Sequence, residues 1–274
     1  MTTAAVSPKT ASGPTTGVGA LLREWRVRRR VSQLDLALRA DSSARHISFI
    51  ETGRARPSQE MVLRLAEHLD VPVRERNVLL IAAGHAPEFP ETPLDDPSMD
   101  ALRTGMERLL TGYEPFPALV VDATYQVVAA NRGIQALLAG VDEQLLRPPL
   151  NAMRITLHPD GLAPRIRNFL EWREHLLAQM QRQLAVMRSA PLRALYEEVS
   201  GYPLPEGGRE TAAGGGHAPY ALPMVIEHDG RVLSFISTIA TFNTPMDVTV
   251  SELALETFLP ADPETAGQLR TWLE

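Results

Sequence analysis

The side chains best equipped for polar recognition gather in one short stretch, SSARHISFIETGRARPS, at residues 42–58. Arg45, Arg54 and Arg56 each carry a guanidinium group, which donates several hydrogen bonds from one plane. Donors of this kind match phosphate oxygens and the edge of guanine. The stretch therefore predicts either a helix that binds nucleic acid or a surface helix followed by a basic, solvent-exposed loop.

Five short helices are expected around this stretch, between residues 17 and 84. Ser32 and Ser58 are placed as N-caps, because each precedes a segment with apolar residues at helical spacing. Gly53 and Gly84 follow such segments, where a glycine commonly ends a helix. The sequence therefore predicts an all-α first domain.

The second and third of these helices fit a helix-turn-helix. Ala37 is small where two helices must approach closely, and Asp41 tolerates the left-handed backbone that the turn needs. Ile47 and Ile50 are three residues apart and are expected to face the core. The opposite face then presents Ser43, Arg45, His46 and Phe49.

The charge of the chain is unevenly distributed. The whole protein has a formal net charge of −6, yet residues 17–84 hold 12 arginines and 8 acidic residues, a balance of +4. The remainder must then carry −10. A basic block joined to an acidic body favours a nucleic-acid module attached to a domain with another task.

The first domain resembles the Xre/Cro-type family of phage and bacterial repressors, over about a quarter of the chain. The sequence departs from the family at Asp41, where glycine is usual, and at Ser42, where an apolar residue is usual. Both departures affect the turn and leave the overall match intact. The residues that carry the resemblance are Gln33, Ala37, Ile47, Ile50, Glu51, Gly53 and Pro57.

This resemblance implies a lambda-repressor-like fold whose third helix enters the major groove of double-stranded DNA. Arg45 is the expected contact to guanine, while Arg54 and Arg56 would hold phosphates. Arg26 and Glu51 match the ion pair that joins two helices in the family, a structural role. The expected DNA-binding residues are Gln33, Ser42, Ser43, Arg45, His46, Phe49, Arg54 and Arg56.

The rest of the chain changes character after residue 84. Residues 1–16 have a composition that predicts a disordered tail, and the proline-rich, acidic residues 85–98 predict a linker or extended strap. Residues 99–274 alternate strand-like and helical segments, including an Asp229-Gly230 pair between apolar runs, a strong hairpin signal. An α+β second domain with a small antiparallel sheet is expected.

This second domain resembles the ligand-binding domain of MmyB-like transcription regulators. The resemblance rests on NAMRITLHPDG, the tryptophan of the long helix, the Asp-Gly hairpin and TFNTPMDVTVSELALETFLPAD, in that order behind an Xre/Cro-type domain. It covers most of residues 99–274 and implies a PAS-like fold, with helices packed around a pocket beside the sheet.

A pocket lined by apolar and amphipathic side chains would suit a small hydrophobic or amphipathic ligand. Arg165, Arg167 or Arg173 would be available for a carboxylate at its mouth, although solvated surface roles are the common alternative. The expected lining residues, which also fit a plain core, are Phe169, Trp172, Met180, Tyr196, Tyr220, Met224 and Phe235.

Several function classes lack their usual signatures. The chain has no cysteine, its seven histidines are scattered, and it has no Gly-x-Ser-x-Gly elbow or Walker loop. We therefore expect no metal, no cofactor and no enzyme activity, and a reducing, cytoplasmic location without a membrane span. The sequence favours a homodimeric regulator that binds a DNA operator; an adaptor or antitoxin-type regulator without a small ligand remains the alternative.

Overall fold

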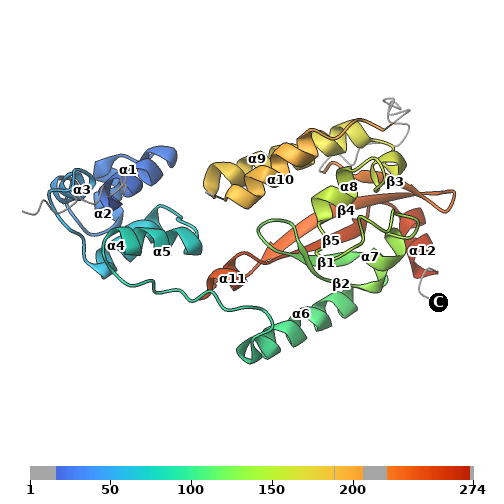
Figure 1. The fold of residues 1–274 in the computed structure, drawn as a ribbon, viewed down its shortest axis with the longest axis horizontal. Coiled ribbons are helices and arrows are strands. Elements are labelled where there is room, and N and C mark those ends of the chain that lie inside the picture. The colour runs from blue at the N-terminus through green and yellow to red at the C-terminus, as the bar shows by residue number, and fades with distance from the viewer. Residues whose placement is uncertain (1–16, 188, 206–220, 272–274) are drawn as a thin grey trace, which may run out of the picture. The chain divides into compact units, whose positions relative to one another are not determined.

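The computed structural model describes residues 17–187, 189–205 and 221–271. Contacts within the chain divide it into two compact units, one ending at Pro90 and the other beginning at Glu91 (Figure 1). The described part of the first unit is helical, and the second combines helices with one sheet. The predicted disordered tail, residues 1–16, lies outside the described residues. No described helix has the length and apolar character needed to span a bilayer.

Five helices form the first unit, as predicted, and serine caps begin three of them. The hydroxyl groups of Ser32, Ser43 and Ser58 accept hydrogen bonds from backbone N–H groups three residues later, at 3.0 to 3.2 Å. The helices are α1 (Val18–Arg28), α2 (Gln33–Arg39), α3 (Ala44–Glu51), α4 (Gln59–His68) and α5 (Val73–Ala82).

The two leucines of α2 that are four residues apart are not the residues that this helix buries. Leu34 and Leu38 recur at helical spacing, but their side chains are 59% and 72% exposed. Leu36 and Ala37 are buried instead, packed toward the core of the unit. The helix has only seven residues, so neighbouring helices rather than its own periodicity decide which side faces inward.

The second unit is built on a five-stranded antiparallel sheet of order β2-β1-β5-β4-β3, which gives it the PAS-like architecture (Figure 1). Its strands are β1 (Ala118–Val121), β2 (Val127–Ala130), β3 (Met224–His228), β4 (Arg231–Thr241) and β5 (Ala254–Pro260). Its longer helices are α6 (Asp100–Tyr113), α9 (Phe169–Val186), α10 (Ala190–Ser200) and α12 (Pro263–Arg270). Its shorter helices are η1 (Pro97–Met99), α7 (Arg132–Leu137), α8 (Ala152–Leu157), η2 (Ala163–Arg165) and α11 (Val248–Ser251).

The sheet is covered on both faces. Met106 and Leu110 of α6 pack against Ala118, Val120 and Leu253 on one side. On the other side, a larger apolar core joins the sheet to α7, α8, α9 and α10. The burial of two faces explains why β1 is apolar at every position.

The predicted Asp229-Gly230 hairpin is confirmed. Asp229 and Gly230 have φ values of 49° and 72°, the left-handed pair that a two-residue hairpin needs, and they join β3 to β4. Asn131 caps α7, and its buried amide also bonds to three backbone groups that surround the start of β1 and the end of α6.

The proline-rich segment at residues 85–98 is tied down at several points. Phe89 is buried, and the amide of Asn77 both accepts from its N–H and donates to its carbonyl. Further along, Thr92 donates from its N–H and its hydroxyl to the carboxylate of Asp247. The bonds of Phe89 lie within the first unit and those of Thr92 within the second.

Candidate DNA-reading face and ligand hollow

The joint between α2 and α3 has helix-turn-helix geometry. Asp41 adopts a φ of 48°, so it occupies the left-handed conformation that was predicted for the turn. The N–H of Ser42 donates to the carbonyl of Ala37 at 2.8 Å, which closes the end of α2. Ala37 is 1% exposed, consistent with the close approach that calls for a small side chain.

Helix α3 has one buried face and one outward face, as its sequence predicts. Ile47 and Ile50 are each 1% exposed. Ser43 and Arg45 are exposed, while His46 and Phe49 are half-buried. The Arg45 guanidinium carbon lies 5.2 Å from the centroid of the Phe49 ring, a cation–π arrangement that places the guanidinium over that ring.

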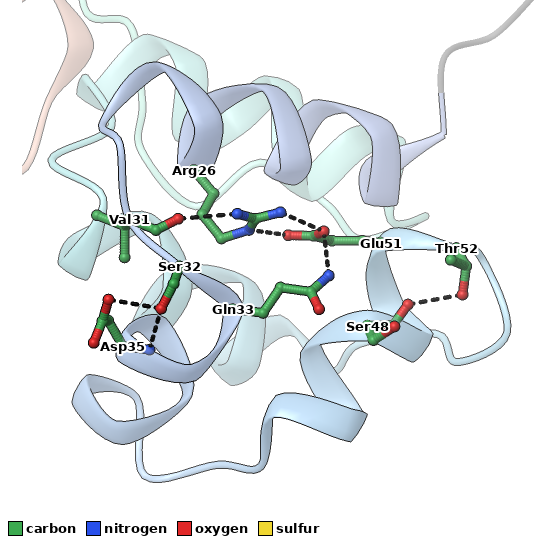
Figure 2. Close-up of polar contacts among 8 residues, drawn as sticks. All are labelled: Arg26, Val31, Ser32, Gln33, Asp35, Ser48, Glu51 and Thr52. Atoms are coloured by element: carbon green, nitrogen blue, oxygen red, sulfur yellow. Dashed lines mark hydrogen bonds and ion pairs between the residues drawn. The ribbon is translucent and has the colours of Figure 1, made fainter.

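A polar network fixes both ends of the helix-turn-helix (Figure 2). Arg26 of α1 donates from Nε and Nη2 to the two carboxylate oxygens of Glu51 at 2.6 and 2.9 Å. Gln33, the first residue of α2, donates from its amide to the same carboxylate at 2.8 Å. Arg26 also donates to the carbonyl of Val31 at 2.9 Å. One carboxylate thereby joins α1, α2 and α3.

These donors stabilise the charged form of Glu51. Burial works to raise the pKa of the carboxyl, but the hydrogen bonds from Arg26 and Gln33, together with the charge of Arg26, hold the pKa of Glu51 below its ordinary value. The hydrogen bond to Glu51 and the charge of Glu51 raise the pKa of Arg26, against the effect of its burial. The predicted structural ion pair is present. Gln33, which the family resemblance assigns to the DNA backbone, lies at the edge of this network.

Arg54 and Arg56, in the loop that follows α3, make different contacts. Gly53 ends α3 with a φ of 73°, and Arg54, which follows it, is exposed. The Arg56 guanidinium instead donates to the carbonyl groups of Ala83 and Gly84 at 2.9 and 3.3 Å, at the end of α5. Both arginines are exposed to solvent, and Arg56 also ties the loop after α3 to the end of α5.

A close contact between α1 and α3 has no obvious signal in the sequence. A Cβ atom added to Gly19 would lie 2.2 Å from the carbonyl oxygen of Ile50, so only glycine fits there. This contact packs the start of α1 against the C-terminal end of α3. Knowledge of which helices meet would be needed to assign this role to Gly19.

The second unit contains a hollow of about 340 Å³ between α9 and β4, within the range of small-ligand sites. Trp172 is the predicted ligand residue that lines it. His175 and Gln179 follow Trp172 by three and seven positions, so they share its stripe on α9, and this spacing was the signal available in the sequence. Among the described residues, the lining is Trp172, His175, Gln179, Ala221, Leu222, Ser237 and Ile239.

The other predicted ligand residues lie in or beside the apolar core. Phe169, Met180, Met224 and Phe235 are buried there, and Met224 and Phe235 are directly opposite each other on β3 and β4. Tyr196 is partly buried and packs against this core. Tyr220 falls outside the described residues.

The arginines considered for a ligand carboxylate have partners away from the hollow. Arg165 donates to the carbonyls of Ala139 and Glu227, and Arg173 donates to the carbonyl of Ser200. Arg167 pairs with the Glu227 carboxylate at 3.1 Å. None of the three lines the hollow. Over the part of the chain that the structure describes, no group of three His, Asp or Glu side chains is arranged to hold a metal ion.

Several solved structures match the chain, and two of them show how low the overall similarity is. The clp gene regulator ClgR from Corynebacterium glutamicum is 27% identical, over 36% of this chain and 89% of its own, with a TM-score of 0.23. An RNA-binding light-oxygen-voltage receptor is 14% identical, over 97% of this chain and 64% of its own, with a TM-score of 0.28. No curated protein matches the sequence significantly.

Comparison with protein families is decisive for both units. A helix-turn-helix family matches residues 22–76, which span most of α1 to α5. The family described as MmyB-like transcription regulator ligand binding domain matches residues 102–271, from α6 to α12 and more than half of the chain. The protein therefore belongs to the MmyB-like transcription regulators.

Proposed function

We propose that this DNA-binding transcription regulator reads a specific operator through the outward face of α3, as a homodimer, and senses a small hydrophobic or amphipathic molecule in its second unit. The observation that carries the DNA-reading part is the division of α3 into a buried Ile47–Ile50 side and an outward side bearing Arg45, beside an exposed Arg54. One such helix contacts few base pairs, so two copies on two half-sites supply the specificity.

Sensing rests on the family match and on the hollow beside Trp172. A ligand that binds one arrangement of the dimer better than another shifts the population toward that arrangement. The spacing of the two reading helices, and with it the affinity for the operator, then depends on the ligand.

The DNA-reading proposal is tested by two arginine variants, after the operator has been selected from random DNA. Arg45→Ala is expected to lose about 1–3 kcal/mol of discrimination between the operator and a site with the contacted guanine replaced. Arg54→Ala is expected to weaken binding to all sequences and to flatten the dependence on salt, because a phosphate contact releases counterions. Parent-like binding by both variants would refute the assignment of α3.

The sensing and dimer proposals have a separate test. Native mass spectrometry of the purified protein gives the oligomeric state, and the same sample under denaturing conditions reveals a co-purified small molecule. Two copies with a small molecule support the proposal. A single copy bound to a different protein, with no small molecule, supports an adaptor instead.

A further inference from the structure

The loop between α3 and α4 carries the exposed Arg54 and depends on more than its own residues. Its start is held by α3, because the N–H groups of Arg54 and Ala55 both donate to the carbonyl of Phe49, at 2.8 and 3.1 Å. Its later part, around the buried Pro57, contacts a segment 28 residues further along the chain. We call residues 52–58 the α3–α4 loop and residues 83–89 the bracing segment.

Two side chains connect the bracing segment to the α3–α4 loop. The Arg56 guanidinium donates from Nε to the carbonyl of Ala83 at 2.9 Å and from Nη2 to the carbonyl of Gly84 at 3.3 Å. In the opposite direction, Nε2 of His85 donates to the carbonyl of Pro57 at 3.0 Å, since a carbonyl oxygen only accepts. Donors thus run both ways between the two stretches, and a shift of the loop breaks these bonds.

Gly84 shows how closely the two stretches meet. Its φ is 76°, and a Cβ atom added there would lie 2.1 Å from Nη2 of Arg56. Room for the guanidinium therefore requires a residue without a side chain at this position. The bracing segment thus forms a fitted site for Arg56, which a merely solvated arginine does not need.

The far end of the bracing segment is fixed on α5. Asn77 accepts at Oδ1 from the N–H groups of Glu88 and Phe89, both at 3.1 Å, and donates from Nδ2 to the carbonyl of Phe89 at 2.7 Å. Phe89 is 8% exposed. Gln59, the first residue of α4, donates to the Glu88 carboxylate at 2.7 Å. The segment is held at both ends, and the second unit begins two residues after it, at Glu91.

We propose that the bracing segment positions the α3–α4 loop for DNA, and that Arg56 acts through this loop and not as a phosphate ligand. The proposal rests on the proposed DNA-reading function and deepens it by naming a route of regulation. The segment that supports the loop of Arg54 also leads to the second unit, so a ligand-dependent change there reaches the DNA contact through these bonds. It differs from the sequence-based expectation that Arg56 holds a phosphate.

The salt dependence of operator binding separates a phosphate contact from a positioning role. Each phosphate contact adds about 0.9 to the slope of the logarithm of affinity against the logarithm of salt concentration. With the full chain and the operator selected from random DNA, Arg54→Ala is expected to lower the slope by about 0.9. Arg56→Ala is expected to weaken binding several-fold and to keep the parent slope. A slope lowered as much by Arg56→Ala as by Arg54→Ala, or parent-like binding by Arg56→Ala, overturns the proposal.

A second variant displaces the Arg56 guanidinium and keeps its charge. Gly84→Ala places a Cβ atom against Nη2, so it is expected to weaken operator binding as Arg56→Ala does, again with the parent slope. The matched control is Gly140→Ala in the second unit, because Gly140 has a φ of 79° and no described atom lies within 4 Å of an added Cβ. Parent-like operator binding by Gly84→Ala refutes the positioning role. If this variant does not fold, Arg56→Ala and Asn77→Ala decide.

Asn77→Ala tests transmission along the bracing segment. Asn77 bonds to the far end of the segment, and alanine is a good helix former, so α5 is expected to persist. Amide exchange of Arg54 and Ala55, measured by mass spectrometry on a peptide from the α3–α4 loop, should become several-fold faster, and operator affinity should fall. Parent-like exchange and affinity in this variant overturn the proposal. Failure of the parent protein to bind any DNA sequence refutes the proposed function instead, so the two failures are distinguishable.

Discussion

Replacement of Glu51 by glutamine should destabilise the first unit far more than the same change on its surface. Glu51 and Arg26 have side chains that are 3% and 12% exposed, and the substitution leaves the Arg26 guanidinium without its counter-charge. Removal of one partner of a buried pair costs about 3–5 kcal/mol. For a domain of this size, about 4 °C is lost per kcal/mol, so the lower bound corresponds to a fall of about 12 °C in melting temperature.

Hydrogen exchange followed by mass spectrometry measures this loss in the full chain, because peptides from α1 to α3 report on their own opening free energy. The matched control is Glu60→Gln. Glu60 is 80% exposed and pairs with Arg64 one helical turn away, an arrangement that contributes about 0.3–0.5 kcal/mol. If Glu51→Gln costs less than about 1 kcal/mol, or no more than Glu60→Gln, the network does not organise the helix-turn-helix as argued.

The same pair of proteins tests the sign of a pH effect. The hydrogen bonds from Arg26 and Gln33 lower the pKa of folded Glu51 relative to its unfolded value, so the folded state binds fewer protons than the unfolded state in acid. The contribution of Glu51 to stability is fully present above the unfolded pKa and is lost as the pH falls through the folded pKa. The difference in opening free energy between the parent and Glu51→Gln should therefore shrink as the pH falls through that range. A difference that grows on acidification would contradict the assignment.

Three further substitutions separate structural roles. Arg56→Ala should lower the stability of the α5 end by about 1–2 kcal/mol, because it removes charge-assisted bonds to the Ala83 and Gly84 carbonyls, whereas Arg54→Ala should leave melting unchanged; equal thermal shifts by calorimetry would contradict this. Met180→Ala should lower the free energy of unfolding, measured in urea, by about 2–5 kcal/mol, because Met180 is 0% exposed in the large apolar core of the second unit. A loss below about 1 kcal/mol would mean that the core closes around the smaller side chain. Asn131→Ala should cost about 1–3 kcal/mol of stability for each buried backbone group that it leaves without a hydrogen bond. Amide exchange should become faster at the start of β1 and of α7. The prediction fails if exchange becomes faster only in other parts of the chain.

Local signals in the sequence predict much of the first unit because its helices begin and end on local chemistry. Serine caps, the left-handed Asp41 and the Ile47–Ile50 spacing each act within a few residues, so they can be read without the fold. The same is true of the Asp229-Gly230 hairpin in the second unit.

Features that depend on distant contacts were not predictable in this way. Gly19 is required by the carbonyl of Ile50, and Arg56 reaches the end of α5, contacts that join residues about thirty positions apart along the chain. The hollow combines a stripe on α9 with alternate residues of β4, so Trp172 was identifiable as a bulky residue on a long helix while Ser237 was not.

The contact between Arg45 and Phe49 has a consequence for how operator preference changes during evolution or design. The Arg45 guanidinium carbon lies 5.2 Å from the centroid of the Phe49 ring, so a new residue at one of these positions removes the contact that orients the other side chain. The two positions should therefore vary together among relatives with different operators. Transplanting a new specificity onto this scaffold requires exchanging both as a pair, while the isoleucines beneath them stay in place.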